Sequence, residues 1–194
     1  MWDERYAVEE YVYGTEPNSF LAEYAGELSG PVLSIAEGEG RNAVFLAAQG
    51  LTVVGVDSST VGLKKAQALA RARDVSITTQ VADLNDYIPE ADFYGAVVSI
   101  FAHLPAHARQ KLYPRLVRSL KAGGLLLLEA YTEGQLAYGT GGPKDIDMLM
   151  SSAKIKAEFP GLEPILLREL ERDVTEGSYH SGRAAVVQFI GRKV

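Results

Sequence analysis

Two glycines and an aspartate stand at a spacing that suits the binding of a nucleoside-containing ligand. Gly38 and Gly40 lie in the stretch AEGEGRNA, between a predicted strand and a predicted helix. Glycine has no Cβ, so a ligand can approach the backbone, and the following helix start offers free N–H groups. Asp57 closes the next predicted strand, where a carboxylate can accept hydrogen bonds from ribose hydroxyls. The turn can therefore hold a dinucleotide pyrophosphate or the carboxylate of an amino-acid cofactor.

Short apolar runs alternate with helix-like stretches through the centre of the chain, and these elements must position the turn. Strands are predicted at residues 32–36, 51–56, 75–81, 93–100 and 125–131, and helices at 41–49, about 60–73 and about 105–120. Continuous apolar strands separated by helices are typical of a parallel sheet covered on both faces. We therefore predict an α/β, Rossmann-like, doubly wound fold. Pro114 predicts a kink or a split in the last of these helices.

Two regions lie outside this alternation. The first 29 residues are rich in tyrosine, and the chain beyond residue 131 holds a glycine-rich loop, a helix-like stretch and two strand-like segments. These last segments, 162–174 and 184–191, predict an antiparallel hairpin with a long connection. We predict one domain over residues 1–194, with an N-terminal aromatic segment (1–29), a cofactor-binding core (30–131) and a substrate-side region (132–194).

The composition limits the classes of partner. The formal net charge is −6 and the pI is about 5.1, so the surface repels nucleic-acid phosphates. The chain has no cysteine, which excludes disulfides, thiolate metal sites and a cysteine nucleophile. The N-terminus does not resemble a signal peptide, and the apolar runs are too short to cross a bilayer. We expect a cytoplasmic protein with no nucleic-acid or membrane partner.

The residues around the glycine turn favour one cofactor class. The spacing Gly38-x-Gly40-x-x-Ala43 also matches a dinucleotide fingerprint, so a nicotinamide-dependent oxidoreductase remains an alternative. Glu37, directly before the turn, would repel a pyrophosphate but would pair with the α-ammonium group of an amino-acid cofactor. Asp83 follows the third predicted strand, where it can accept a hydrogen bond from an adenine amino group. These features favour S-adenosylmethionine.

The motifs resemble those of a known superfamily. The blocks VLSIAEGEGRNAVFLA, VVGVDSS, VADL, DFYGAVVSIFAHLP and LKAGGLLLLEAY resemble the successive motifs of class I S-adenosylmethionine-dependent methyltransferases. Within that superfamily the chain is most similar to the tellurite-resistance and thiopurine methyltransferase-like group, whose aromatic N-terminal segment resembles WDERY and YGTEPNSFL here. The sequence departs from the first motif at Ser34 and Ala36, which replace an acid and a glycine. We infer that Glu37 replaces the missing carboxylate.

The resemblance implies a fold, a cofactor and a set of contacts. The fold is a seven-stranded sheet, mostly parallel with one antiparallel strand, and helices on both faces. The cofactor is S-adenosyl-L-methionine, the product is S-adenosyl-L-homocysteine, and the partner is a small-molecule methyl acceptor. The resemblance implies that Gly38 and Gly40 line the methionine moiety, that Asp57 binds the ribose, and that Asp83, Ser58 and Leu84 surround the adenine. It implies that Ser99 lies near the sulfonium, and that the lid over the cofactor includes Trp2, Arg5, Tyr11 and Tyr13.

Methyl transfer from a sulfonium needs an oriented nucleophile and the exclusion of water, and a base only if the nucleophile must lose a proton. The candidate catalytic residues are His103, Tyr131 and Arg183, and the alternative for His103 is a hydrogen bond to backbone. His180 is expected in a solvated turn. Arg41 is expected to bind an anionic substrate or an acidic neighbour such as Glu39.

Three further expectations concern what the protein binds. His103 and His107 have no carboxylate nearby in the sequence, so no metal is expected. The chain has no basic face or large insertion, which favours a small acceptor such as a thiol, a selenium or tellurium oxyanion, or a metabolite. A protein that binds S-adenosylmethionine without turnover remains an alternative. The sequence indicates no oligomeric state.

Overall fold

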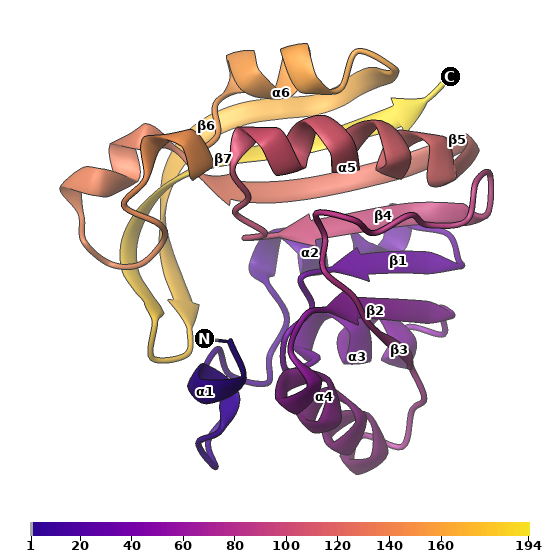
Figure 1. Ribbon diagram of the computed structural model, residues 1–194, viewed down its shortest axis with the longest axis vertical. Coiled ribbons are helices and arrows are strands. Elements are labelled where there is room, and N and C mark those ends of the chain that lie inside the picture. Colours follow the sequence, from indigo (N-terminus) through magenta and orange to yellow (C-terminus); the bar gives the residue numbers. More distant parts are fainter. Residues whose placement is uncertain (1) are drawn as a thin grey trace.

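The computed structural model describes residues 2–194 and places all its strands in one sheet (Figure 1). The strands are β1 (Val32–Ile35), β2 (Val53–Asp57), β3 (Thr78–Val81), β4 (Tyr94–Ile100), β5 (Leu120–Tyr131), β6 (Leu162–Glu176) and β7 (His180–Lys193). Their order is β3-β2-β1-β4-β5-β7-β6. Strands β1 to β5 pair in parallel, and β7 pairs antiparallel with both β5 and β6. The predicted seven-stranded mixed sheet is confirmed, and its antiparallel pairings are the two that β7 makes, with β5 and with β6 of the C-terminal hairpin.

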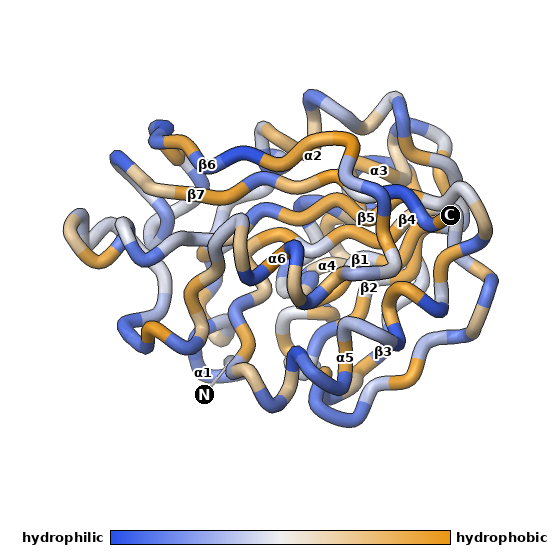
Figure 2. Tube along the Cα trace, turned by 90° about the horizontal axis from the view of Figure 1, so that it is seen from above, coloured by the Kyte–Doolittle hydropathy of each residue, from blue (hydrophilic) through white to orange (hydrophobic). Residues whose placement is uncertain are grey.

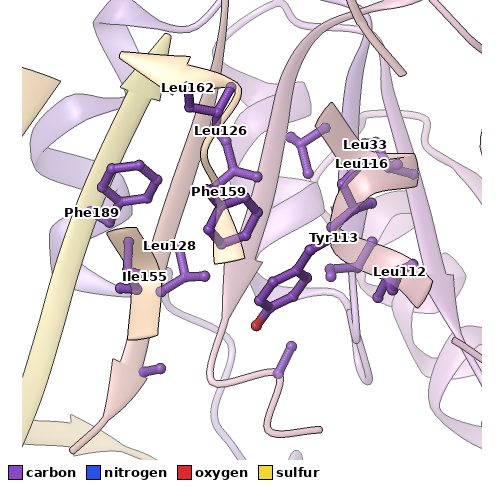
Figure 3. Close-up of a cluster of buried hydrophobic side chains, with 14 of the residues drawn as sticks. Leu33, Leu112, Tyr113, Leu116, Leu126, Leu128, Ile155, Phe159, Leu162 and Phe189 are labelled. Carbon is purple, nitrogen blue, oxygen red and sulfur yellow. The ribbon is translucent and has the colours of Figure 1, made fainter. Parts of the chain in front are cut away.

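Helices cover both faces of this sheet. They are α1 (Trp2–Tyr6), α2 (Ser19–Tyr24), α3 (Arg41–Ala48), α4 (Thr60–Ala72), α5 (Ala106–Ser119) and α6 (Ser152–Glu158), with short 3₁₀ helices η1 (Ala25–Glu27), η2 (Glu133–Ala137) and η3 (Ile146–Met148). One apolar core packs α5 and α6 on the sheet, where Leu112, Tyr113 and Phe159 meet Leu126 and Phe189 (Figure 3). The other core packs α2, α3 and α4 on the opposite face.

The two cores follow from the period of the strands. Successive side chains of a strand point to opposite faces, so Leu33 and Val97 join the α5–α6 core while Val32 and Ala96 join the other. All seven residues of β4 are buried, as expected of a strand covered on both faces. Hydrophobic stretches accordingly concentrate in the strands of the sheet (Figure 2).

The register of the parallel strands brings three loops to one edge of the sheet. Ile35 at the end of β1 is level with Val56 of β2 and Ser99 of β4. The glycine turn, the end of β2 and the loop after β4 therefore lie next to one another. Ligands bind at this edge of open α/β sheets.

Two sequence expectations about the elements need comment. Pro114 lies inside α5, which continues to Ser119, so the helix is not split there, and the alternative of a kink stays a prediction. The connection of the hairpin is only residues 177–179, with Glu176 paired to His180, instead of the long loop expected. The polar residues of EGSYHSGR concealed the ends of β6 and β7. Among residues 2–194, no helix combines the length and apolarity that a bilayer crossing requires.

Candidate functional site

A cavity of about 570 Å³ opens at the carboxyl ends of β1, β2 and β4, a volume typical of small-molecule sites. Its wall is formed by the N-terminal segment, the glycine turn, the loops after β2, β3 and β4, residues 141–143 and the tip of the β6–β7 hairpin. Most of the residues singled out in the sequence line it: Trp2, Arg5, Tyr13, Glu37, Gly38, Asp57, Ser58, Asp83, Leu84 and His103. The fold thus brings together side chains from both halves of the chain.

The two glycines of the turn have different structural roles. Gly38 has φ 60° and Gly40 has φ 94°, a region that favours glycine. A Cβ on Gly38 would lie 2.7 Å from the hydroxyl of Tyr6, so glycine is needed beneath the N-terminal segment. A Cβ on Gly40 would lie 2.5 Å from the Cβ of Ala66 in α4. Gly40 does not line the cavity, so the structure supports a role in the close packing of α3 against α4, and the cofactor contact stays a prediction.

Asp57 is held rigidly at the end of β2. One carboxylate oxygen accepts from the Gly38 N–H at 2.8 Å, and the other accepts from the Ser59 N–H at 2.8 Å. Burial raises the pKa of Asp57, against the effect of these backbone bonds. Each carboxylate oxygen can accept a second hydrogen bond, so the side chain retains the capacity to bind ribose hydroxyls.

Glu37 is buried between the turn and the first strand. One of its oxygens accepts from the Ala43 N–H at 2.8 Å and the other from the Ser34 hydroxyl. Burial raises the pKa of Glu37 to about 7, although the bonds from Ser34 and Ala43 and the charge of Arg41 oppose this. The carboxyl group lines the cavity next to the serine that replaces the usual acid. Its pairing with a cofactor ammonium group stays a prediction.

The residues expected to contact the adenine line the cavity, whereas the residue expected near the sulfonium does not. Asp83, Leu84 and Ser58 line the cavity, and Asp83 accepts two hydrogen bonds from Asn85, which lower its pKa. Ser99 is only 2% exposed and does not line the cavity. Its side chain lies one residue before the part of β4 that lines the cavity, so the structure does not support its approach to the sulfonium, which stays a prediction. The next residues of the chain, 100–105, form that wall.

The N-terminal segment covers the cavity with aromatic rings. The rings of Trp2 and Tyr6 stack at 5.8 Å, and the guanidinium of Arg5 lies 4.7 Å from the Trp2 ring. Arg5 also donates to the Tyr13 hydroxyl at 2.9 Å. Tyr11 does not line the cavity, because its hydroxyl donates to a backbone carbonyl of α4. Tyr6 lines it instead, and the sequence analysis missed this residue although it lies beside Arg5.

The catalytic candidates do not converge as expected. Nε2 of His103 accepts from the backbone N–H of Tyr131 at 3.0 Å, and burial lowers the pKa of His103 to about 3. Its lone pair is therefore engaged, so the structure does not support a role as general base and favours the alternative of a hydrogen bond to backbone. Tyr131 is buried behind Phe101, with ring centroids 4.5 Å apart, and does not line the cavity. The side chain of Arg183 is 51% exposed and pairs with Glu171 at 3.2 Å, outside the cavity.

Two polar residues that line the cavity, His180 and Arg41, were not among the candidate catalytic or cofactor-binding residues. His180 begins β7 and lines the cavity, so the expectation of a solvated turn is wrong. Burial, followed by the charges of Arg41 and Arg5, lowers the pKa of His180 to about 3. Arg41 also lines the cavity and donates to Glu176 at 2.5 Å. Glu39, the neighbour expected for Arg41, pairs with Lys65 instead.

A buried polar network fixes Arg41 in place. Glu129 is fully buried and accepts from Asn18 Nδ2 at 2.6 Å and from Arg172 Nη2 at 2.7 Å. Asn18 and Arg172 also donate to Glu176, at 2.8 Å and 3.3 Å. Because Glu176 is the partner of Arg41, the guanidinium is held through groups from three distant parts of the chain: Asn18, Glu129 and strand β6. No single stretch of sequence signals this network.

The residues of the cavity suit S-adenosylmethionine. The Asp57 carboxylate suits a ribose, and aromatic faces of the wall attract a sulfonium. One nitrogen of Arg41 has no hydrogen-bond partner among the described residues. Over residues 2–194 there is no group of three His, Cys, Asp or Glu side chains suited to hold a metal ion.

Comparisons with known proteins agree with this assignment. A family model described as a methyltransferase domain matches residues 32–124. A 2-heptyl-1-hydroxyquinolin-4(1H)-one methyltransferase of Mycobacteroides abscessus is 24% identical over 124 residues, which are 62% of this chain and 55% of that protein. The match thus spans about half the length of the curated relative.

Solved structures share the fold over nearly the whole chain. A structure from work on the conversion of a disulfide bond into a thioacetal group in echinomycin biosynthesis has a TM-score of 0.80 and 19% identity, covering 99% of this chain and 90% of that one. A protein of Methanosarcina mazei described as an S-adenosylmethionine-dependent methyltransferase has a TM-score of 0.72 and 14% identity, covering 92% and 99%. Residues 32–124 thus match a methyltransferase domain model, and the chain shares its fold with solved S-adenosylmethionine-dependent methyltransferases.

Proposed function

We propose that this protein transfers a methyl group from S-adenosylmethionine to a small-molecule acceptor. The observation that supports this most directly is the clasp between the Asp57 carboxylate and the Gly38 N–H on the wall of a cavity that aromatic side chains cover. Gly38 and Asp57 both lie within residues 32–124, the range that matches the methyltransferase domain model.

The residues of the cavity have separate roles in this proposal. Asp57 binds the ribose, Asp83 and Leu84 the adenine, and Glu37 the ammonium group of the methionine moiety. When bound, S-adenosylmethionine supplies a methyl group on a sulfonium, whose carbon–sulfur electron pair leaves with the sulfur. The protein contributes orientation and the exclusion of water, and Trp2 and the other lid rings favour the cation.

The acceptor side of the cavity indicates a largely apolar substrate. Phe101, Leu104, Pro143 and Met148 line it, and such walls orient flat, apolar molecules. The curated relative acts, by its name, on 2-heptyl-1-hydroxyquinolin-4(1H)-one, a flat molecule with one acidic hydroxyl. We propose an acceptor of comparable shape. Membership of the tellurite-resistance and thiopurine methyltransferase-like group, a cytoplasmic location and the lack of nucleic-acid or membrane partners remain proposals that rest on the sequence.

The cofactor is tested by ligand-dependent stability. We expect S-adenosylmethionine and S-adenosylhomocysteine to raise the melting temperature, with a stabilisation of about 2.7 kcal/mol at a hundredfold excess over Kd. The Asp57→Ala variant should lose most of this shift, whereas Asp86→Ala, outside the cavity, should retain it. A shift only with NAD or NADP would establish the oxidoreductase alternative, and binding without methyl transfer to any acceptor would establish the non-catalytic one.

A further inference from the structure

Buried polar atoms without partners lie at one part of the cavity wall and directly behind it. Among the described residues, Arg41 Nη1, His180 Nδ1 and Tyr131 Oη are buried and make no hydrogen bond. A buried polar group without a partner costs about 1–3 kcal/mol, so such groups are retained where a ligand satisfies them or water reaches them. Arg41 and His180 line the cavity directly.

These groups are neighbours near the tip of the hairpin. The rings of Tyr131 and His180 lie 5.4 Å apart and nearly perpendicular. Glu176, which binds Arg41, is paired with His180 across the hairpin. A Cβ on Gly141, which lines the cavity, would lie 3.0 Å from the His180 ring and 3.2 Å from the Tyr131 hydroxyl. Only a glycine therefore fits at this position, packed against the His180 ring and the Tyr131 hydroxyl.

The chemistry of this corner suits an anion. The Arg41 side chain is 9% exposed and offers its second nitrogen as a charged donor, while Glu176 engages the first. His180 stays neutral because its pKa is low, so it offers one N–H or one lone pair without adding charge. An ammonium group would be repelled by Arg41, and a neutral thiol would be a weak acceptor for its guanidinium.

We propose that Arg41 and His180 form the subsite for the reacting oxygen of the acceptor, which binds as the oxyanion of an acidic hydroxyl group. This proposal rests on the proposed function. The hydroxyl proton leaves to solvent as the acceptor binds, and the oxygen lone pair then forms the O–C bond while the C–S pair stays with sulfur. The charges of oxyanion and sulfonium cancel, so the transfer needs no general base. This agrees with the engaged lone pair of His103.

The test compares two probes of the same shape on protein loaded with S-adenosylhomocysteine. We expect 4-nitrophenol to bind, and its visible spectrum to show more phenolate than in buffer of the same pH. The isosteric 4-nitroaniline, which forms no anion, should bind at least about tenfold more weakly, as expected for one lost hydrogen bond to a charged group.

Two variants locate the effect. Arg41→Lys keeps the charge and the partner Glu176 but loses the second nitrogen, and His180→Phe removes both ring nitrogens within an aromatic cluster. Each should weaken 4-nitrophenol binding about tenfold and reduce the phenolate fraction. Tyr24→Phe, a tyrosine outside the cavity, is the matched control and should change neither.

The anion that Arg41 binds could instead be the methionine carboxylate of the cofactor, and a second experiment distinguishes this case. If Arg41 binds the methionine carboxylate, Arg41→Lys will weaken S-adenosylhomocysteine but not 5′-methylthioadenosine, which lacks that group, and the proposal is overturned. It is equally overturned if the loaded wild-type protein binds both probes alike or fails to bind 4-nitrophenol at millimolar concentration. Because S-adenosylhomocysteine binding is measured first by its thermal shift, loss of the proposed function itself is recognised separately.

Discussion

The glycine turn and the hairpin side of the cavity are built in different ways. In the turn, the polar bonds join residues close in sequence, such as Glu37 with Ser34 and Asp57 with Ser59. On the hairpin side, Asn18 is bonded to Glu129 and Glu176 across more than a hundred residues. The first arrangement can form with two strands and one helix in place. The second exists only when the whole sheet is assembled, so it links the site to global folding.

The largest effect should follow from breaking the long-range network. Glu129→Gln keeps the shape of a fully buried side chain but leaves Arg172 short of a compensating charge. Removing one partner of a buried ion pair costs roughly 3–5 kcal/mol, which chemical denaturation would measure. Glu163→Gln, exposed on β6, is the control and should unfold as the wild type does. A cost below about 1 kcal/mol in Glu129→Gln would show that the network does not stabilise the fold.

In the glycine turn, the buried Glu37 should make the stability of the protein depend on pH. The pKa of Glu37 is about 7 in the native state, and the unfolded chain has the ordinary value of 4.5. As pH rises from 4.5 to 7, the unfolded state releases this proton first, so wild-type stability falls. Glu37→Gln lacks this loss, and its stability relative to wild type should grow by about 3 kcal/mol over that window.

The measurement is the free energy of unfolding in urea at several pH values for both proteins. The low pKa values of His103 and His180 act in the opposite direction, because stability is lost as pH falls below about 6.5. They are present in both proteins and cancel in the difference. Parallel pH profiles for wild type and variant would contradict the raised pKa of Glu37.

A smaller effect should follow at the helix contact of the turn. Gly40→Ala forces a Cβ against Ala66 at a φ of 94°, and we expect a loss of about 2 kcal/mol. Gly50→Ala, at the other end of α3, has a φ of 86° but nothing within 4 Å of the new Cβ. It reports the backbone cost alone, so equal losses would mean that the contact with Ala66 relaxes freely.

The smallest effect should follow from replacing Arg183, in contrast to Arg41. Arg183→Gln removes an exposed side chain that pairs with Glu171, and exposed pairs contribute little to stability. We expect an unchanged melting temperature and unchanged affinity for S-adenosylhomocysteine by calorimetry, in contrast to the effect of Arg41→Lys on 4-nitrophenol. Weakened cofactor binding in Arg183→Gln would restore this residue as a site candidate.

The same contrast explains what could be predicted from the sequence. The turn, Asp57 and Asp83 are marked by their positions at strand ends, which depend on local periodicity and glycine placement, and all lie at the cavity. His180 and Arg183 differ by three residues, yet one lines the cavity and the other faces outward. Their placement depends on where β7 begins, and polar side chains along the exposed β6 edge concealed that point. Glu129 reads as the lone acid in an apolar strand, and its partners cannot be inferred from neighbours.

The N-terminal segment meets the turn of the β6–β7 hairpin over the cavity, and this contact bears on how ligands exchange. Helix α1 lies beside the turn of the β6–β7 hairpin (Figure 1), where the Ser178 N–H donates to the Val12 carbonyl at 2.9 Å. Arg5 also lies over the Tyr179 ring at 5.1 Å. If the two segments open together, these contacts must break at the same time, and we expect ligand entry and departure to occur in one opening event. The exchange rate of the Ser178 amide hydrogen should therefore track the dissociation rate of a bound product.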